Sequence, residues 1–507
     1  MNANTAPQTT PGTADDALTD VEVVIIGTGF AGLGMGAQLK RHGRDSFVLL
    51  ERAGDVGGTW RDNTYPGAAC DIPSHIYSFS FRPNPDWSRV FSPGPEIQTY
   101  LRETAREEGL MPHVRFGADV EGARWDSAAQ RWTVTTSRGI FTGRFLVTGT
   151  GHLADEALPT IPGLEDFTGE VFHSARWRQD VSLEGKRVGI VGSGASAIQL
   201  VPEVAKVASE LVVFQRSAQY IKPRPDRAYS DTEKRTFRRD AEAIPDHRAE
   251  LFWTLESGYA ARRAVPNYLA EARTEALRHL ERQVADPGLR ANLTPDYELG
   301  CKRVLISDTY YPALTRDNVT LEASALARVE GDKAFSADGN AFEFDVLIFC
   351  TGFETTEPPY ARLVHGADGR SLADHWAQGM EAFASTTVTG FPNLFILNGP
   401  NTGLTHNSLV YMIETQVDYV LGALDWSQVN GDAVLEVSPE AQERYVTELQ
   451  ERTAGTVWVG DGCKSWYVDQ RSGRLTLVWP DFAHAFRYRN GTFDPAPYTT
   501  AGSLAAV

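Results

Sequence analysis

The first apolar run of the chain opens a pattern of strand, glycine-rich turn and helix. Residues 21–26 are almost all apolar, which is typical of a strand buried on both faces of a parallel sheet. A glycine-rich turn follows at 27–32, then a helical stretch to residue 40 and an apolar strand over 47–50 that ends at Glu51. Strand, turn, helix, strand and acid, in this order, predict a βαβ unit that binds a dinucleotide.

Each residue type in this turn has a physical role. Gly27 permits the tight turn, Gly29 lets the backbone approach a pyrophosphate, and Gly32 packs the helix against the strand. The phosphates face the N-terminus of the helix, and the carboxylate of Glu51 accepts hydrogen bonds from ribose hydroxyls. We therefore predict that the first dinucleotide has an unphosphorylated ribose.

The same unit recurs further along the chain. A strand over 187–191 leads into the turn 192–197, a helix and a second strand over 211–214. This strand ends in Gln215 and Arg216 where the first unit has an acid. An arginine suits the extra phosphate of NADPH, which a carboxylate would repel. The chain is thus predicted to hold two different dinucleotides.

Composition limits the class of protein. With 507 residues and 42% hydrophobic residues the chain is a globular protein, and no apolar stretch approaches the roughly 18 residues of a membrane helix. The net charge of −18 opposes nucleic acid and anionic membranes as partners. The four cysteines are widely spread without a CxxC pair, so we expect reduced thiols in a cytoplasmic enzyme and no metal site.

Two further motifs accompany the dinucleotide units. GGxWxxxxYPGxxxD runs from Gly57 to Asp71, and FxGxxxHxxxW runs from Phe167 to Trp177. These motifs, together with the flanking glycine turns, resemble the fingerprints of type I Baeyer–Villiger monooxygenases. Related flavin-containing monooxygenases and N-hydroxylases end the histidine motif in Phe or Tyr, so Trp177 favours the Baeyer–Villiger branch. Arg178 departs from the Pro or Asp that usually follows this tryptophan.

The resemblance implies roles for individual residues. It implies that FAD is bound by the first turn and the segment after it: Gly27, Gly29, Phe30, Ala31, Gly32, Glu51, Gly58, Thr59, Trp60, Asp71 and Tyr77. It implies that NADPH is bound by the second turn and two cations, with an aromatic side chain near the nicotinamide: Gly192, Ser193, Gly194, Ala195, Ser196, Ala197, Arg216, Lys302 and Trp466. Arg303 matches the family's catalytic arginine, and Asp71 matches the carboxylate that pairs with it. We expect the second motif to act on domain motion through Phe167, Gly169, His173 and Trp177.

The expected fold is α/β, with two Rossmann-like dinucleotide-binding domains. Residues 1–20 are expected to form a disordered tail, and residues 21–155 the first part of the FAD-binding domain. Residues 156–385 form the predicted NADPH-binding domain, with a helical insertion at about 228–295. Residues 386–507 return to the FAD-binding domain.

The predicted activity is an NADPH- and O2-consuming, FAD-dependent Baeyer–Villiger oxidation of a ketone to an ester or lactone through a flavin peroxide. A fixed guanidinium at Arg303 would stabilise the peroxide anion and the later oxyanion, and Asp71 would orient that guanidinium. Two alternatives remain open: oxygenation of an amine or sulfide, and a non-catalytic dinucleotide-binding redox sensor. The expected partners are a small-molecule ketone and O2, with the protein a monomer or homodimer.

Overall fold

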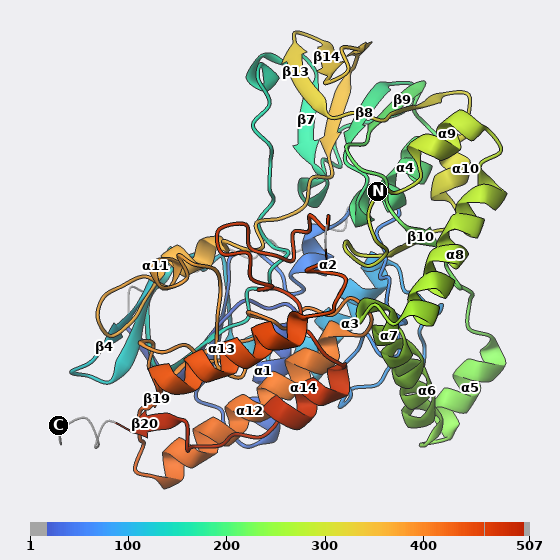
Figure 1. Cartoon of the computed structure of the whole chain (residues 1–507). Helices are drawn as coiled ribbons and strands as arrows, with labels where there is room; N and C mark the ends of the chain where they lie inside the picture. Colours follow the sequence, from blue (N-terminus) through green and yellow to red (C-terminus); the bar gives the residue numbers. More distant parts are fainter. Residues whose placement is uncertain (1–17, 461, 501–507) are drawn as a thin grey trace, which may run out of the picture.

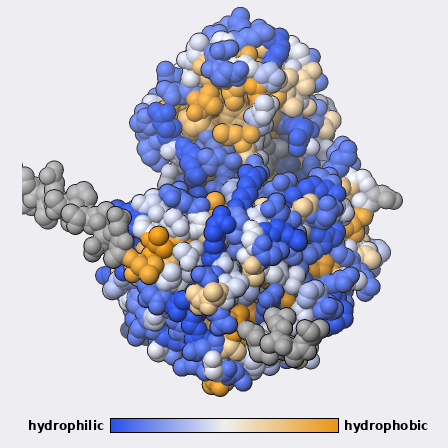
Figure 2. All heavy atoms as spheres, turned by 90° about the vertical axis from the view of Figure 1, so that its left-hand side faces the viewer, coloured by the Kyte–Doolittle hydropathy of each residue, from blue (hydrophilic) through white to orange (hydrophobic). Residues whose placement is uncertain are grey.

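The computed structural model describes residues 18–460 and 462–500. Of the predicted tail, residues 1–17 lie outside the described residues, and the first strand begins at Thr19. The chain forms a larger lobe and a smaller lobe joined at a narrow waist (Figure 2). Strands β7, β8 and β9 lie in the smaller lobe, whereas α1, α12 and α13 lie in the larger lobe (Figure 1). Each lobe contains one of the two predicted dinucleotide units.

The sheet of the larger lobe has the strand order β17-β4-β5-β6-β1-β2-β3, and β18 also pairs with β6. Strand β1 pairs in parallel with β2 and with β6, as expected for a strand buried on both faces. The strands of this sheet are β1 (Thr19–Ile26), β2 (Phe47–Glu51), β3 (Val114–Phe116), β4 (Val120–Asp126), β5 (Arg131–Thr136), β6 (Gly139–Thr148), β17 (Val364–His365) and β18 (Leu394–Ile396).

The sheet of the smaller lobe is parallel throughout, in the order β12-β9-β8-β16-β7. Its strands are β7 (Glu170–His173), β8 (Arg187–Val191), β9 (Glu210–Phe214), β12 (Val319–Glu322) and β16 (Val346–Phe349). Three small sheets complete the strands: β13 (Leu326–Glu330) with β14 (Lys333–Ser336) and β15 (Ala341–Glu343), β10 (Ile221–Lys222) with β11 (Leu305–Ile306), and β19 (Leu435–Val437) with β20 (Tyr498–Thr500).

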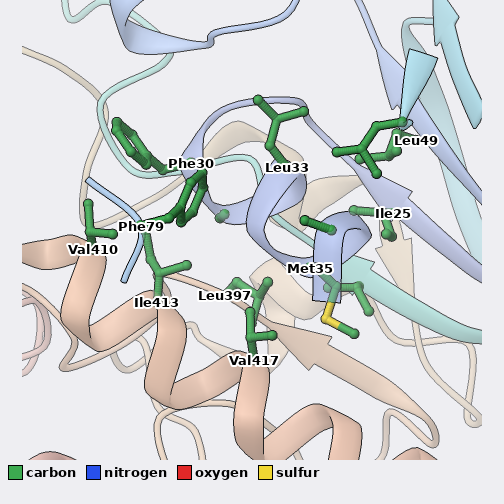
Figure 3. Packing of buried hydrophobic residues seen from close by; sticks show 14 of the residues in the cluster. Ile25, Phe30, Leu33, Met35, Leu49, Phe79, Leu397, Val410, Ile413 and Val417 are labelled. Carbon is green, nitrogen blue, oxygen red and sulfur yellow. The ribbon is translucent and has the colours of Figure 1, made fainter. Parts of the chain in front are cut away.

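Helix α1 is buried along most of its length, which fixes its glycine turn in place. Phe30 and Leu33 of α1 pack among residues from β1, β2 and the long helix α12 (Figure 3). Val410, Ile413 and Val417 of α12 project towards α1. The helices of the larger lobe are α1 (Phe30–Arg41), α2 (Thr59–Asp62), α3 (Gly94–Glu107), α11 (Leu372–His375), α12 (Leu409–Val429), α13 (Pro439–Thr453) and α14 (Ala483–Asn490).

Helices α4 (Ala195–Val204) and α10 (Tyr310–Leu314) accompany the second sheet. Five helices follow one another within the segment where the sequence predicts an insertion: α5 (Asp231–Arg239), α6 (Ala243–Ser257), α7 (Tyr259–Arg262), α8 (Pro266–Gln283) and α9 (Pro287–Asn292). The chain returns to the first sheet at β17, which pairs with β4, earlier than the return at residue 386 that the sequence predicts. Among the described residues, no helix is both long and apolar enough to cross a membrane.

The carboxylate of Glu256 anchors the insertion to the C-terminal part of the chain. Glu256, on α6, is 2% exposed and accepts hydrogen bonds from the Asn407 amide and from the backbone N–H of Ala483. The rings of His406 and His484 also lie within hydrogen-bond distance of its two oxygens. Such a buried carboxylate requires this number of partners, because an unpaired buried charge is costly.

Candidate active site

The first glycine turn forms a cradle that fits the pyrophosphate of FAD. Gly29 is the N-cap of α1, and no side chain caps the free N–H groups of this helix end. Such uncapped N–H groups, with the helix dipole, attract phosphate oxygens. Gly58 has φ +52°, and a Cβ there would lie 3.1 Å from the Cα of Gly29. A side chain at Gly58 would therefore press on the turn that has to admit the phosphates.

Glu51 lies at the end of β2, as predicted, and is 4% exposed. Its carboxylate accepts a 2.6 Å hydrogen bond from the Thr28 hydroxyl and pairs with Arg61 at 2.8 Å. These contacts hold the carboxylate beside the glycine turn, where a ribose hydroxyl can donate to it.

Aromatic side chains close one side of this cradle. Tyr77 packs edge-on against Phe30 at 5.1 Å and against Trp60 at 5.6 Å between ring centroids. The indole N–H of Trp60 donates to the Tyr77 hydroxyl at 3.3 Å. Trp60 follows Thr59, the first residue of α2. The predicted FAD residues after Glu51 are thus brought together next to the first residue of α1.

The second glycine turn leaves open space in front of α4. Gly194 is the uncapped N-cap of α4, and a Cβ at Gly194 would meet no atom within 4 Å. At Gly192, φ is +123° and a Cβ would lie 2.4 Å from the carbonyl oxygen of Cys350, so only glycine fits. Ser193, Ala195, Ser196 and Ala197 complete the turn and the first residues of α4.

Two cations meet beside this second turn. Arg216 is exposed and follows β9, and Lys302 extends over the ring of Tyr297, with Nζ 4.4 Å from the ring centroid. Burial lowers the pKa of Lys302, and the nearby positive charge of Arg216 lowers it further. Within the described part of the chain neither cation forms an ion pair with a carboxylate. The arrangement suits a phosphate group, which would satisfy both charges.

Arg303 and Asp71 form a bidentate ion pair. Nε of Arg303 donates to Oδ2 of Asp71 at 2.7 Å, and Nη2 donates to Oδ1 at 2.8 Å. Nη1 donates to the carbonyl oxygen of Leu404 at 3.3 Å. Burial by itself lowers the pKa of Arg303, but the charge and hydrogen bonds of Asp71 outweigh burial and raise it. The pKa of Asp71 is correspondingly lowered by Arg303 against the opposing effect of burial.

The pair retains a polar, partly open environment. The Arg303 and Asp71 side chains are 28% and 27% exposed, so about a quarter of each can meet a ligand. Next to them lies Tyr467, whose buried hydroxyl has no hydrogen-bond partner among the described residues. Burial raises the pKa of Tyr467 to about 12, so the phenol is neutral.

Sequence reasoning missed Tyr467 and a second guanidinium, Arg262. Arg262 donates to the carbonyl oxygen of Thr405 at 2.8 Å, next to the Leu404 carbonyl that Arg303 uses. Burial and the charge of Arg303 lower the pKa of Arg262, although Tyr467 opposes this, to about 10. Tyr467 stands directly after Trp466 in the sequence, which is the one signal that could have found it. Nothing in the sequence distinguishes Arg262 from neighbouring Arg263.

The histidine motif lies at the edge of the second sheet. His173 ends β7, where it pairs with Phe349 of β16, and is 3% exposed. Its Nδ1 accepts from the backbone N–H of Ala175 at 3.1 Å, whereas Nε2 is buried without a partner among the described residues. Burial lowers the pKa of His173, so the ring is neutral at neutral pH.

The other residues of this motif pack within the smaller lobe. Trp177 packs edge-on against Phe172 at 5.2 Å, and Phe167 packs on the core of the small lobe. A Cβ at Gly169 would lie 2.4 Å from the carbonyl oxygen of Asp345. Arg178, which departs from the family pattern, forms surface ion pairs with Asp180 and Glu170.

The expectation of four reduced cysteines is wrong. Cys301 and Cys463 form a disulfide with a Cα–Cα distance of 5.6 Å, although they are separated by 162 positions in the sequence. Folding places them side by side, which spacing along the chain cannot show. Cys70 and Cys350 are free and buried. Trp466, three residues after Cys463, is 45% exposed.

Comparison with known proteins identifies the family. A family model described as flavin-binding monooxygenase-like matches residues 20–232. A Baeyer–Villiger monooxygenase of Streptomyces coelicolor is 47% identical over 480 residues, which cover 94% of this chain and 92% of that protein. The chain belongs to the Baeyer–Villiger monooxygenase family.

A Baeyer–Villiger monooxygenase of Pseudomonas aeruginosa is 43% identical over 508 residues, 100% of this chain and 96% of that protein. The crystal structure of OTEMO in complex with FAD and NADP superposes with a TM-score of 0.84 at 27% identity and covers 96% of this chain and 100% of that one. Membership of the family confirms the predicted α/β fold with two dinucleotide-binding domains, the enzyme class and the cofactors FAD and NADPH.

Proposed function

We propose that this Baeyer–Villiger monooxygenase converts a small-molecule ketone into an ester or lactone at a centre built around Arg303 and Asp71. The observation that carries the proposal is the bidentate Arg303–Asp71 ion pair, which joins segments 232 positions apart in the sequence. One of these segments follows the FAD cradle, and the other carries Lys302 of the second cofactor site. The pair therefore belongs to the region where both cofactors approach one another.

When bound, FAD supplies the redox chemistry: it accepts hydride from NADPH and activates dioxygen. Arg303 supplies a fixed positive charge, since its raised pKa prevents loss of the proton. As the ketone carbonyl is attacked, its oxygen gains negative charge, and a guanidinium N–H placed beforehand stabilises that charge. Asp71 does not exchange a proton in this scheme. It orients the guanidinium and compensates its charge.

Arg303 donates one hydrogen bond besides those to Asp71, and this restricts its orientation. The Leu404 carbonyl accepts from Nη1, and the neutral phenol of Tyr467 lies beside the pair. We assign Arg303 as the catalytic residue and Asp71 as its positioning residue.

The remaining roles concern the cofactors. Arg216 and Lys302 bind the 2′-phosphate of NADPH, which makes NADPH the preferred nicotinamide cofactor. Trp466 packs near the nicotinamide. His173, with Phe167, Gly169 and Trp177, transmits motion between the two lobes, because the motif lies on the connection into the smaller lobe.

The direct test is product analysis with a ketone panel, NADPH and ¹⁸O2. We expect esters or lactones that carry one ¹⁸O atom from dioxygen. Oxygenation of amines or sulfides without ketone conversion would support heteroatom oxygenation instead. NADPH binding without bleaching of the flavin would support a redox sensor.

We also propose that the protein acts in the cytoplasm as a monomer or homodimer and binds no nucleic acid. The net charge of −18 supports the last point, because the phosphate backbone repels an acidic protein. Size-exclusion chromatography with in-line light scattering would measure the oligomeric state, and cell fractionation would test the location.

A further inference from the structure

The Cys301–Cys463 disulfide links two segments that carry proposed active-site residues. Cys301 directly precedes Lys302 and Arg303, and Cys463 lies three residues before Trp466. The bond thus connects the backbone of the catalytic arginine with the backbone of the aromatic residue assigned to the nicotinamide. A disulfide elsewhere on the surface would have no such relation to the site.

Cys463 itself makes few non-covalent contacts, although Trp458, Ser465 and Tyr467 around it are buried. The N–H of Cys463 donates to the carbonyl oxygen of Gly460, and the N–H of Tyr467 donates to the Ser465 hydroxyl. Both hydrogen bonds are local, and among the described residues neither reaches the Cys301 segment. Trp466 is 45% exposed and packs mainly on Tyr467, with 4.4 Å between ring centroids. The disulfide is therefore the covalent constraint on Cys463 and its exposed neighbours, whereas Val457, Trp458 and Tyr467 are held by the buried cluster that also contains Leu299.

The two sulfur atoms differ in access. Cys301 is fully buried, whereas Cys463 is half-buried and its neighbours Gly462 and Lys464 are exposed. An incoming thiolate reaches the Cys463 sulfur more easily, and attack there makes Cys301 the leaving thiolate.

We propose that Cys301–Cys463 is a thiol-exchange site through which dithiol reductants change how the enzyme holds NADPH. One thiolate of the dithiol attacks the Cys463 sulfur, the disulfide breaks, and the Cys301 thiolate takes up a proton. The second thiol of the reductant then attacks the mixed disulfide and releases Cys463 as a thiol. In total the protein disulfide gains two electrons and two protons, and the reductant becomes a cyclic disulfide.

Reduction releases Cys463 and the exposed Trp466 side chain from this covalent link, while Tyr467 stays buried and the Arg303–Asp71 ion pair stays intact. FAD binding should not change, because the contacts that hold Glu51 beside the first glycine turn come from Thr28 and Arg61 and involve neither cysteine. The KM for NADPH should rise at least fivefold, and a larger share of NADPH should be consumed without product. This functional consequence rests on the proposed roles of Arg303 and Trp466; the exchange chemistry does not.

The experiment uses the holoenzyme and dithiothreitol as the probe. Thiols are alkylated before and after treatment, after denaturation, and are counted by peptide mass spectrometry. We expect alkylation of Cys70 and Cys350 in untreated protein and of all four cysteines after treatment. Alkylation of all four cysteines in untreated protein purified without reductant would overturn the proposal.

Variants separate the exchange site from other effects of the reductant. Cys463→Ser should show the raised KM for NADPH without any reductant and should not respond to dithiothreitol. Lys464→Ala, at an exposed position next to Cys463, leaves the disulfide intact and should respond as the wild type does. Verified reduction with an unchanged KM and unchanged coupling would also overturn the proposal. If the untreated enzyme made no ester, the proposed function would fail, yet the thiol count would still test the exchange site.

Discussion

The Arg303 guanidinium donates two parallel hydrogen bonds to the Asp71 carboxylate, at 2.7 and 2.8 Å. This geometry aims Nη1 at the Leu404 carbonyl and leaves part of the side chain exposed for a ligand. The pair is therefore a preorganised charge, and in the proposed mechanism it stabilises negative charge on oxygen.

We predict that Arg303→Ala binds FAD and is still reduced by NADPH but makes no ester. Loss of one preorganised donor to a developing oxyanion costs about 3–4 kcal/mol, which is a hundredfold or more in rate. Flavin bleaching by stopped flow and product analysis measure the two halves of the reaction separately. Asp71→Ala should be milder, because Arg303 remains but is poorly oriented. Ester formation at near-normal rate by Arg303→Ala would contradict the assignment.

We predict that Arg216→Ala reduces the preference for NADPH over NADH. The arginine is exposed, lies beside Lys302 and has no carboxylate partner in the described part of the chain, so its substitution removes a phosphate contact and little else. A charge-assisted hydrogen bond contributes about 1.5–3 kcal/mol, so the KM for NADPH should rise tenfold or more while the KM for NADH stays the same. Arg106→Ala, at an exposed arginine of α3, is the control. An equal increase in the KM for NADPH and in the KM for NADH would show that Arg216 does not contact the phosphate.

We predict that His173→Ala slows turnover and uncouples NADPH consumption from product formation while FAD stays bound. Its Nε2 is buried and has no partner among the described residues, so a bound cofactor can supply one. Loss of one hydrogen bond of about 1.5 kcal/mol corresponds to roughly tenfold in kcat. Single-turnover kinetics should show slower steps that depend on domain motion. Slow oxygen insertion with all other steps normal would place His173 in the catalytic group.

The local units could be predicted from the sequence because their signals are local. Both glycine turns, the strands before them and the acid or arginine after them lie within about thirty residues, so spacing alone defines each βαβ unit. The position of Arg303 opposite Asp71 came from resemblance to a family, since 232 positions separate the two residues. Their geometry agrees with that expectation.

Long-range contacts between ordinary residues could not be predicted. Nothing in the sequence pairs Cys301 with Cys463, places Arg262 beside Arg303, or distinguishes Glu256 from other acids of its helix. Each of these contacts depends on how the helical insertion and the C-terminal part pack against the first sheet. The sequence also could not show that the chain returns to the first sheet at β17. A strand of two residues is too short to produce a periodic hydrophobic pattern.

Glu256 leads to a prediction about stability. The buried carboxylate holds α6 to the chain around His406 and His484. Burial by itself raises the pKa of Glu256, but hydrogen bonds from His406, Asn407 and His484 outweigh burial and lower it to about 2. A carboxylate whose pKa is lower in the folded state stabilises the fold above its unfolded pKa, and this contribution is lost as the pH falls towards the folded value.

We therefore predict that Glu256→Gln lowers the free energy of unfolding at neutral pH by about 3–5 kcal/mol, because it removes one partner from a buried charged cluster. The difference in free energy of unfolding between wild type and variant should become smaller as the pH falls from about 4.5 towards about 2, because the wild-type carboxyl then becomes protonated as well. Glu250→Gln, at a 77% exposed position of the same helix, is the matched control and should change stability by less than about 0.5 kcal/mol. Thermal unfolding followed by circular dichroism over this pH range measures the difference. An equal deficit for Glu256→Gln at pH 7 and pH 2.5 would show that the ionised carboxylate does not hold the insertion in place.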